Sequence, residues 1–406
     1  MRIQAHTLIL SAVIMAAAES AASAPLQAPP APPKKTARPV RTAAPAAEDW
    51  ERLKAQADAA RETDQIPEAV GLYRKLVKLK PKWPEGWWYL GALQYERDQY
   101  AGAAEAFRKY LVLEPENGQG WGMLGLCEFR VKDYVRSLQH LTKARSLGLG
   151  GNEELARSVR YHQALLFTLG RQFEAALSVL NGFAVEHRES SPVLEAMGMA
   201  ALRMPNLAED LKPGDREAVR KFGKAQFLAG ERRDDEAIEM FLKLEAEYRG
   251  RPNVAYAVAT AMLLRGDHEN ALRYFKQELE RDPRHVPAMI QYSLEAIALE
   301  RFEEGLVHAR KAAELEPDNF AVHYVQGRIY LYLGDLPSSI ASLERAAALA
   351  PESAPVFYTL SQAYRRANRP ADAEKALAEF RRLDALEKRR VTGVPLPEAR
   401  GSVPPK

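Results

Sequence analysis

Small and bulky apolar residues recur at a fixed spacing through most of this 406-residue chain. A small residue is followed four positions later by an apolar one, and often eight positions after that by a proline. The small positions are Ala69, Ala103, Ser137, Ala176, Ala237, Ala271, Gly305, Ser339 and Ala373. The apolar positions are Tyr73, Phe107, Leu141, Leu180, Phe241, Phe275, Ala309, Leu343 and Leu377. The step from Ala69 to Ala103 is 34 residues, and a sustained period of this length indicates a repeat protein.

A second series of small residues runs between the first. Its members are Gly91, Gly125, Ala164, Ala225, Ala259, Ser293, Gly327 and Ser361. Large apolar residues surround both series at helical spacing, which predicts two helices per repeat whose backbones approach at the small residues. Proline cannot continue a helix, so the recurring prolines predict the turn between repeats. One helix pair cannot bury its own apolar face, and we therefore expect the pairs to stack.

About nine units of this kind cover most of the chain, and two of them carry a recognisable pattern. The units start near Trp50, Pro84, Gly118, Arg157, Ala218, Pro252, Val286, Phe320 and Ala354. The tetratricopeptide pattern W-x2-L-G-x2-Y…A-x3-F…P is matched by Trp87, Leu90, Gly91, Ala103, Phe107 and Pro115, with Gln94 in place of its tyrosine. Trp121, Leu124, Gly125 and Ser137 match it again. The chain therefore resembles the tetratricopeptide repeat family, in an exported bacterial form. The resemblance implies an all-α, right-handed α-solenoid (superhelix) of antiparallel helix pairs, with about nine 34-residue repeats plus one truncated unit.

The period is interrupted twice. Ser137 to Ala176 is five residues longer than one period, and the glycines at 148, 150 and 151 predict a wide loop there. Ala176 to Ala237 is less than two periods, which predicts a truncated unit, either a hinge or a packing irregularity. The expected organisation is a signal peptide (1–24), a Pro/Ala-rich linker (25–46), a block of four repeats (47–190), the truncated unit (191–217), a block of five repeats with a capping helix (218–390) and a disordered tail (391–406).

The N-terminal residues indicate export. A positive Arg2, a short apolar run over 8–18 and the small-x-small motif Ala22-Ser23-Ala24 are typical of a secretory signal peptide cleaved after Ala24. The alternative is an uncleaved anchor, although the apolar run is shorter than the ~20 residues that span a bilayer. The following linker carries seven prolines and four basic residues, which favour a solvated tether or contact with an anionic surface. We expect a periplasmic or secreted protein.

Composition and motifs do not indicate catalysis. The formal net charge is only +3, which gives no support for a nucleic-acid partner. Gly120 to Gly125 satisfies G-x-G-x-x-G, but it lies inside a predicted helix without the strand that a dinucleotide site requires. The eight histidines form no zinc-ligand spacing, and the single cysteine, Cys127, is expected to be a packed small side chain. We therefore expect no enzyme activity, no cofactor and no metal site.

The candidate binding residues follow from the family resemblance, which implies that first helices line a concave groove for a partner segment. The residue after the tryptophan position is aromatic in six of eight units, and Tyr and Trp with Arg dominate protein interfaces. The predicted groove residues are Trp88, Tyr95, Phe129, Tyr161, Phe222, Tyr256, Tyr324, Arg328, Tyr332, Tyr358 and Arg365. The alternative is that these aromatic residues pack between repeats. The Lys/Asn clamp with which some family members hold a C-terminal carboxylate is not recognisable.

These features predict a non-catalytic scaffold or assembly factor that binds a protein or peptide partner outside the cytoplasm. Aromatic faces also stack on sugar rings, so a module that binds cell-wall or extracellular glycan is the alternative. Membrane contact is expected only through an uncleaved signal segment or the basic linker.

Overall fold

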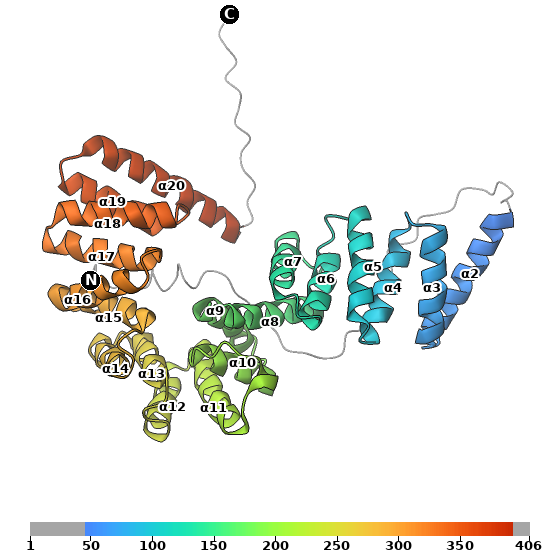
Figure 1. The fold of residues 1–406 in the computed structure, drawn as a ribbon, viewed down its shortest axis with the longest axis horizontal. Coiled ribbons are helices and arrows are strands. Elements are labelled where there is room, and N and C mark those ends of the chain that lie inside the picture. The colour runs from blue at the N-terminus through green and yellow to red at the C-terminus, as the bar shows by residue number, and fades with distance from the viewer. Residues whose placement is uncertain (1–44, 393–406) are drawn as a thin grey trace, which may run out of the picture. The chain divides into compact units, whose positions relative to one another are not determined.

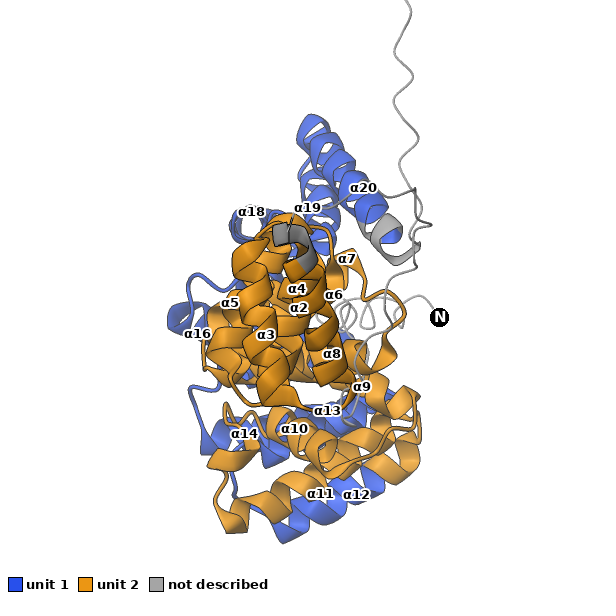
Figure 2. Ribbon diagram, turned by 90° about the vertical axis from the view of Figure 1, so that its right-hand side faces the viewer, with its two compact units in different colours: residues 1–14, 238–406 blue, residues 15–237 orange. Residues whose placement is uncertain are grey.

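A computed structural model describes residues 45–392, and every regular element in that range is a helix (Figure 1). The predicted signal peptide, almost all of the linker and nearly all of the tail lie outside the described residues. The chain divides into two compact units, and the boundary between them along the sequence lies between Ala237 and Ile238 (Figure 2). We call their described parts the N-terminal unit (45–237, orange) and the C-terminal unit (238–392, blue). The boundary lies inside the second predicted repeat block, 218–390.

Helices of the N-terminal unit pack mainly on their neighbours in sequence. They are α2 (Pro45–Glu62), α3 (Ile66–Leu79), α4 (Pro84–Glu96), α5 (Tyr100–Leu113), α6 (Gly118–Arg130), α7 (Tyr134–Leu147), α8 (Glu153–Leu169), α9 (Phe173–Val185), α10 (Ser191–Ala201), the short η1 (Ala208–Asp210) and α11 (Pro213–Gly230). The next helix, α12 (Asp234–Glu247), contains the boundary at which the chain passes from the N-terminal unit to the C-terminal unit.

The C-terminal unit continues the same alternation of first and second helices. Its elements are α13 (Val254–Met262), η2 (Leu263–Arg265), α14 (His268–Arg281), α15 (Val286–Ala298), α16 (Phe302–Leu315), α17 (Phe320–Leu333), α18 (Leu336–Leu349), α19 (Ala354–Arg366) and α20 (Pro370–Thr392). The all-α fold of consecutive helix pairs is thus confirmed. No helix of the described residues is both long enough and apolar enough to cross a membrane.

The predicted small positions are the points of closest approach within a pair. A methyl group on Gly125 of α6 would lie 2.6 Å from Cδ2 of Leu141 on α7, and one on Gly327 of α17 would lie 2.6 Å from Cγ of Leu343 on α18. The hydroxyl of Ser137 donates to the Gly125 carbonyl at 2.8 Å. These contacts join the two series of small residues, so the 34-residue period is explained by helix crossing.

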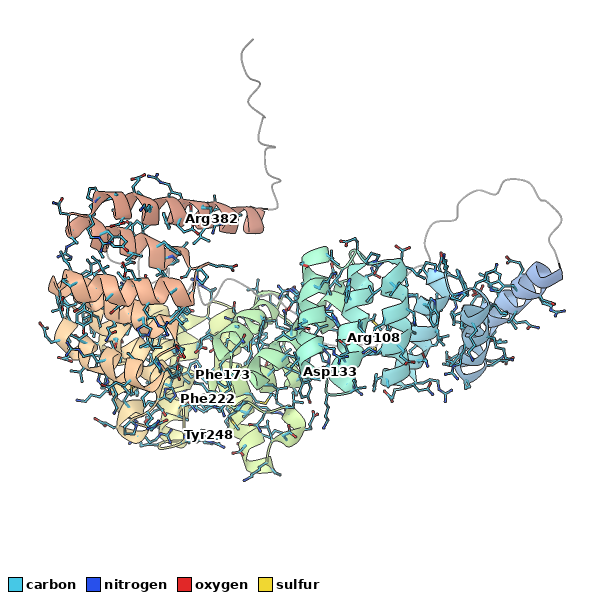
Figure 3. The ribbon with its side chains drawn as sticks, turned by 45° about the horizontal axis from the view of Figure 1, so that its top comes forward. Arg108, Asp133, Phe173, Phe222, Tyr248 and Arg382 are labelled. Atoms are coloured by element: carbon cyan, nitrogen blue, oxygen red, sulfur yellow. The ribbon has the colours of Figure 1, made fainter. Side chains whose placement is uncertain are left out.

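Two kinds of turn connect the helices. Within a pair, the chain turns through one residue with positive φ, such as Lys132 (φ 64°), and Asp133 then caps α7 by accepting from the Arg136 amide (Figure 3). Between pairs, a side chain on the first helix donates back to a proline carbonyl. The donors and acceptors are Trp87 and Pro81 (2.8 Å), Trp121 and Pro115 (2.8 Å), and His323 and Pro317 (2.7 Å).

Both interruptions of the period have structural counterparts. The longer connection after α7 leads into α8, which has 17 residues where α4 and α6 have 13. The stretch 191–217 supplies α10, which packs closely against α11, and the short turn η1. A methyl group on Gly198 of α10 would overlap the Val219 carbonyl of α11, so these backbones are nearly in contact.

Candidate protein-binding surface

All eleven predicted groove residues lie on first helices, but their exposure differs. Phe222 on α11, Tyr256 on α13 and Tyr324 on α17 are buried. The Tyr256 ring lies 5.6 Å from Phe275 and 5.2 Å from His285. These three rings therefore contribute to the packing of the repeats, as in the alternative interpretation that the aromatic residues pack between repeats.

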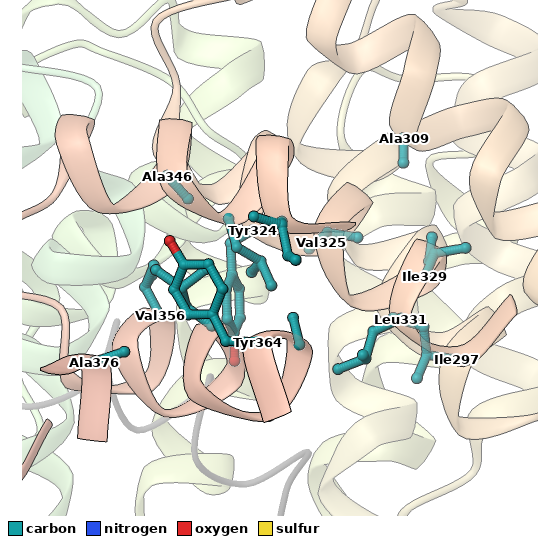
Figure 4. Close-up of a cluster of buried hydrophobic side chains, with 14 of the residues drawn as sticks. Ile297, Ala309, Tyr324, Val325, Ile329, Leu331, Ala346, Val356, Tyr364 and Ala376 are labelled. Atoms are coloured by element: carbon teal, nitrogen blue, oxygen red, sulfur yellow. The ribbon is translucent and has the colours of Figure 1, made fainter. Parts of the chain in front are cut away.

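Tyr324 shows how such a ring is used. It belongs to the buried cluster of the C-terminal unit, beside Val325 and near Val356 and Tyr364 (Figure 4). Its hydroxyl accepts from Thr359 on α19 at 3.4 Å, which links successive first helices. The guanidinium of Arg328, one turn further along α17, lies 5.7 Å from the ring centroid and is half-buried.

In the N-terminal unit, the predicted rings other than Phe222 remain partly accessible. Trp88 lies edge-on to Phe107 at 5.6 Å and to Tyr110 at 5.2 Å, on the second helix of its own pair. Tyr95 lies 5.3 Å from Tyr100 across the turn between α4 and α5, and burial raises the pKa of its phenol to about 12. Both side chains are half-buried, and the Tyr95 phenol stays uncharged at neutral pH.

A histidine that the aromatic pattern does not identify joins two of the predicted residues. The ring of His162 on α8 lies 4.7 Å from Phe129 on α6 and 5.5 Å from Tyr161. Its Nδ1 lies 2.8 Å from the Ser158 carbonyl, and burial lowers its pKa to about 4. The neutral ring therefore extends an aromatic surface across two consecutive first helices. Only its position next to Tyr161 could have indicated this role.

The most exposed predicted residues lie in the C-terminal unit. Tyr332 of α17 is 49% exposed and stacks on Phe302 of α16 at 5.0 Å with an interplanar angle of 7°. Tyr358 of α19 is 37% exposed and lies 5.2 Å from Phe380 of α20. Arg365, also on α19, is exposed. These side chains present apolar faces and a cation to solvent.

The residues that resemble catalytic motifs have packing roles. Cys127 is fully buried, and burial raises the pKa of its thiol, which keeps it protonated. The Gly120–Gly125 motif lies within α6, where Gly125 meets Leu141. No group of metal-ligating side chains comes together within residues 45–392.

Buried carboxylates are likewise held by neighbouring side chains. Glu128 on α6 accepts from Arg108 on α5 at 3.1 Å and lies 2.6 Å from Nδ1 of His140 on α7. Glu128 thus links three consecutive helices, and its carboxylate helps to hold α5, α6 and α7 together.

Comparison with known proteins agrees with the helix-pair geometry. A family model described as the tetratricopeptide repeat matches residues 54–117, 99–152 and 293–354. The chain contains tetratricopeptide repeats. The matched stretches fall on α2 to α7 and on α15 to α18, so both units contribute such repeats.

Solved structures with this repeat resemble parts of the chain. MamA from Desulfovibrio magneticus RS-1 is 18% identical over 42% of this chain and 96% of its own, with a TM-score of 0.39. YrrB, described as a TPR protein with an unusual peptide-binding site, is 14% identical over 44% of this chain and 92% of its own, with a TM-score of 0.36. No curated protein matches the sequence.

Proposed function

We propose that this protein is a non-catalytic scaffold that binds a segment of a protein partner through the first helices of its tetratricopeptide repeats, outside the cytoplasm. The observation that carries the proposal is the set of partly exposed aromatic side chains on first helices, above all Tyr332 and Tyr358. Tyrosine supplies a large amphipathic contact area with few rotatable bonds, which suits recognition of a protein segment. Export follows from the signal-like N-terminus and is part of the proposal.

The partner segment contacts each unit through its own accessible residues. In the N-terminal unit these are Trp88, Tyr95, Phe129 and Tyr161, and in the C-terminal unit Arg328, Tyr332, Tyr358 and Arg365. Phe222, Tyr256 and Tyr324 support the repeats and do not contact the partner.

The test is affinity capture from an envelope extract, with the full chain as bait. The comparison bait carries Tyr332→Ser and Tyr358→Ser, two changes at exposed rings that leave the buried core intact. The matched control carries Val112→Ser and Val307→Ser, which remove apolar side chains that are 78% and 66% exposed on second helices. We expect one protein to be retained by the native and control baits and lost by the tyrosine variant.

Two other outcomes contradict the proposal. Equal retention by all three baits places the contact away from these first-helix residues. Retention of polysaccharide or peptidoglycan without any captured protein favours the glycan-binding alternative instead.

A further inference from the structure

An arginine-rich cavity lies in the N-terminal unit beside the longer connection between α7 and α8. Its volume is about 650 Å³. The charged residues that line it are Arg145, Glu153, Arg157, Arg160, Glu186 and Arg188. Four guanidinium groups face two carboxylates, so the lining has a net charge of +2. An excess of positive charge in a concave site attracts an anionic group.

The cavity exists because this repeat departs from the pattern of its neighbours. In α4 and α6 the tryptophan position closes the preceding turn, through Trp87 and Trp121. In the repeat that starts near Arg157, Arg160 holds the equivalent position, and α8 begins about one turn earlier, at Glu153. The extra turn and the arginine leave an opening where α4 and α6 place an indole ring.

The wall of the cavity is held in place by its own contacts. The connection runs through three glycines with positive φ at 148, 150 and 151, a conformation that other residues rarely adopt. The Leu149 carbonyl accepts from Gln119 of α6 at 3.1 Å, and Asn152 caps α8 by accepting from the Leu155 amide at 3.0 Å. These bonds hold both ends of the longer connection in place, and so they fix the position of α8, which carries Arg157 and Arg160.

Two arginines of the cavity have long contacts with its glutamates. Nη1 of Arg157 lies 3.6 Å from the carboxylate of Glu153, and Nη2 of Arg160 lies 3.4 Å from that of Glu186. Strong guanidinium–carboxylate bonds are about 2.7–2.9 Å long. The Glu153 side chain is 84% exposed, and the Arg157 Nε is buried with no hydrogen-bond partner among the described residues. An incoming carboxylate can therefore displace Glu153 at little cost, because the Glu153 carboxylate is largely in solvent and its contact with Arg157 is long.

We propose that this cavity binds carboxylate side chains from an acidic segment of the protein partner. The inference rests on the proposed function and adds the chemistry of the partner. Two carboxylates of the chain itself, those of Glu153 and Glu186, already lie within 3.6 Å of Arg157 and Arg160, so a carboxylate can reach these guanidinium groups. The same two charges repel a phosphate dianion more strongly than a singly charged carboxylate.

The test is direct binding of a fluorescein-labelled tetraglutamate peptide to the full chain, followed by fluorescence anisotropy. Labelled tetraglutamine measures binding that does not depend on charge. We expect Arg157→Gln to weaken tetraglutamate binding by at least about tenfold, which corresponds to about 1.4 kcal/mol. Glu153→Gln removes the internal competitor and is expected to tighten binding about twofold to fivefold. Arg97→Gln, at an exposed site after α4, is the control for loss of one positive charge and should have no effect.

Each other result overturns the inference. It is wrong if the native chain binds tetraglutamate no better than tetraglutamine, or if Arg97→Gln weakens binding as much as Arg157→Gln. Displacement by inorganic phosphate at a lower concentration than by free glutamate identifies a phosphate site instead. If Arg157→Gln does not fold, the inference is tested with Arg188→Gln, at an exposed residue, and with Glu153→Gln. It is then wrong if Arg188→Gln does not weaken tetraglutamate binding and Glu153→Gln does not tighten it. Failure here leaves the capture experiment unaffected, because its variants alter different residues.

Discussion

The contact between α10 and α11 predicts that replacing one glycine hydrogen by a methyl group destabilises the N-terminal unit. A Cβ on Gly198 would lie 2.6 Å from the carbonyl carbon of Val219 and 3.0 Å from the amide nitrogen of Gly223. The reverse contact is equally close, because a Cβ on Gly223 would lie 2.6 Å from the carbonyl carbon of Leu194. Both obstacles are main-chain atoms, which cannot rotate away as a side chain can.

The expected size of the effect comes from this geometry. Carbon atoms pack favourably at about 3.5–4.0 Å, and the Val219 carbonyl oxygen is nearer than its carbon, so Gly198→Ala requires α10 and α11 to separate by at least about 1 Å. Overpacking of this kind costs about 1–3 kcal/mol, and the rigid obstacle favours the upper end. Alanine's better helix propensity returns about 0.8–1.0 kcal/mol. The net expectation is a loss of about 2 kcal/mol in the free energy of unfolding.

The assay is urea denaturation followed by far-ultraviolet circular dichroism, with Gly214→Ala as the matched control. Gly214 lies in the first turn of α11, and no atom comes within 4 Å of the place its Cβ would occupy. That substitution should leave the first unfolding midpoint unchanged or raise it. If Gly198→Ala also leaves the midpoint unchanged, the helices are not in backbone contact and the reasoning fails.

Three further substitutions test other parts of the packing. Ser137→Ala removes the hydroxyl bound to the Gly125 carbonyl and should lower the free energy of unfolding by about 0.5–1.5 kcal/mol in urea titrations. The pKa of His162 is lowered to about 4, so its neutral form favours the folded state above an unfolded pKa of about 6.5, and this stability is lost as the pH falls towards 4. Lowering the pH from about 7 to 5 should therefore cost about 2 kcal/mol, and His162→Phe should show a smaller loss over the same range. Glu278→Ala leaves the Arg281 guanidinium and the start of α13 without their carboxylate and should cost about 2 kcal/mol in thermal or urea unfolding.

The sequence predicts the helix pairs well because the relevant contacts repeat. The small residues at Gly125 and Ser137 are conspicuous only because equivalent positions recur every 34 residues. Each helix crossing imposes the same steric condition, so the period carries the structural information. The closing prolines add the position of each turn, and the hydrogen bond from Trp121 to Pro115 shows why the tryptophan accompanies them.

The exposure of the candidate site could not be predicted in the same way. Tyr256 and Tyr358 occupy equivalent positions in their repeats, yet the first is buried and the second is 37% exposed. Exposure depends on the side chains that lie against each ring: His285, at the start of the following repeat, lies 5.2 Å from Tyr256, whereas Tyr358 belongs to the last helix pair and lies 5.2 Å from Phe380 of α20. A one-dimensional pattern specifies which face a residue occupies, but not which side chain of the neighbouring repeat lies against it.

The breaks in the period are the places where the structure departs from a uniform stack. The close contact between Gly198 and Gly223 occurs in the stretch that fits no repeat, so no second copy made either glycine conspicuous. The arginine cavity depends on the five-residue lengthening before α8 and on Arg160 in place of a tryptophan. The first helices α4 and α6 carry an indole ring at the equivalent position. The proposed recognition of an acidic partner segment therefore rests on residues at a break in the period, whereas the proposed aromatic contacts lie on the regular repeats.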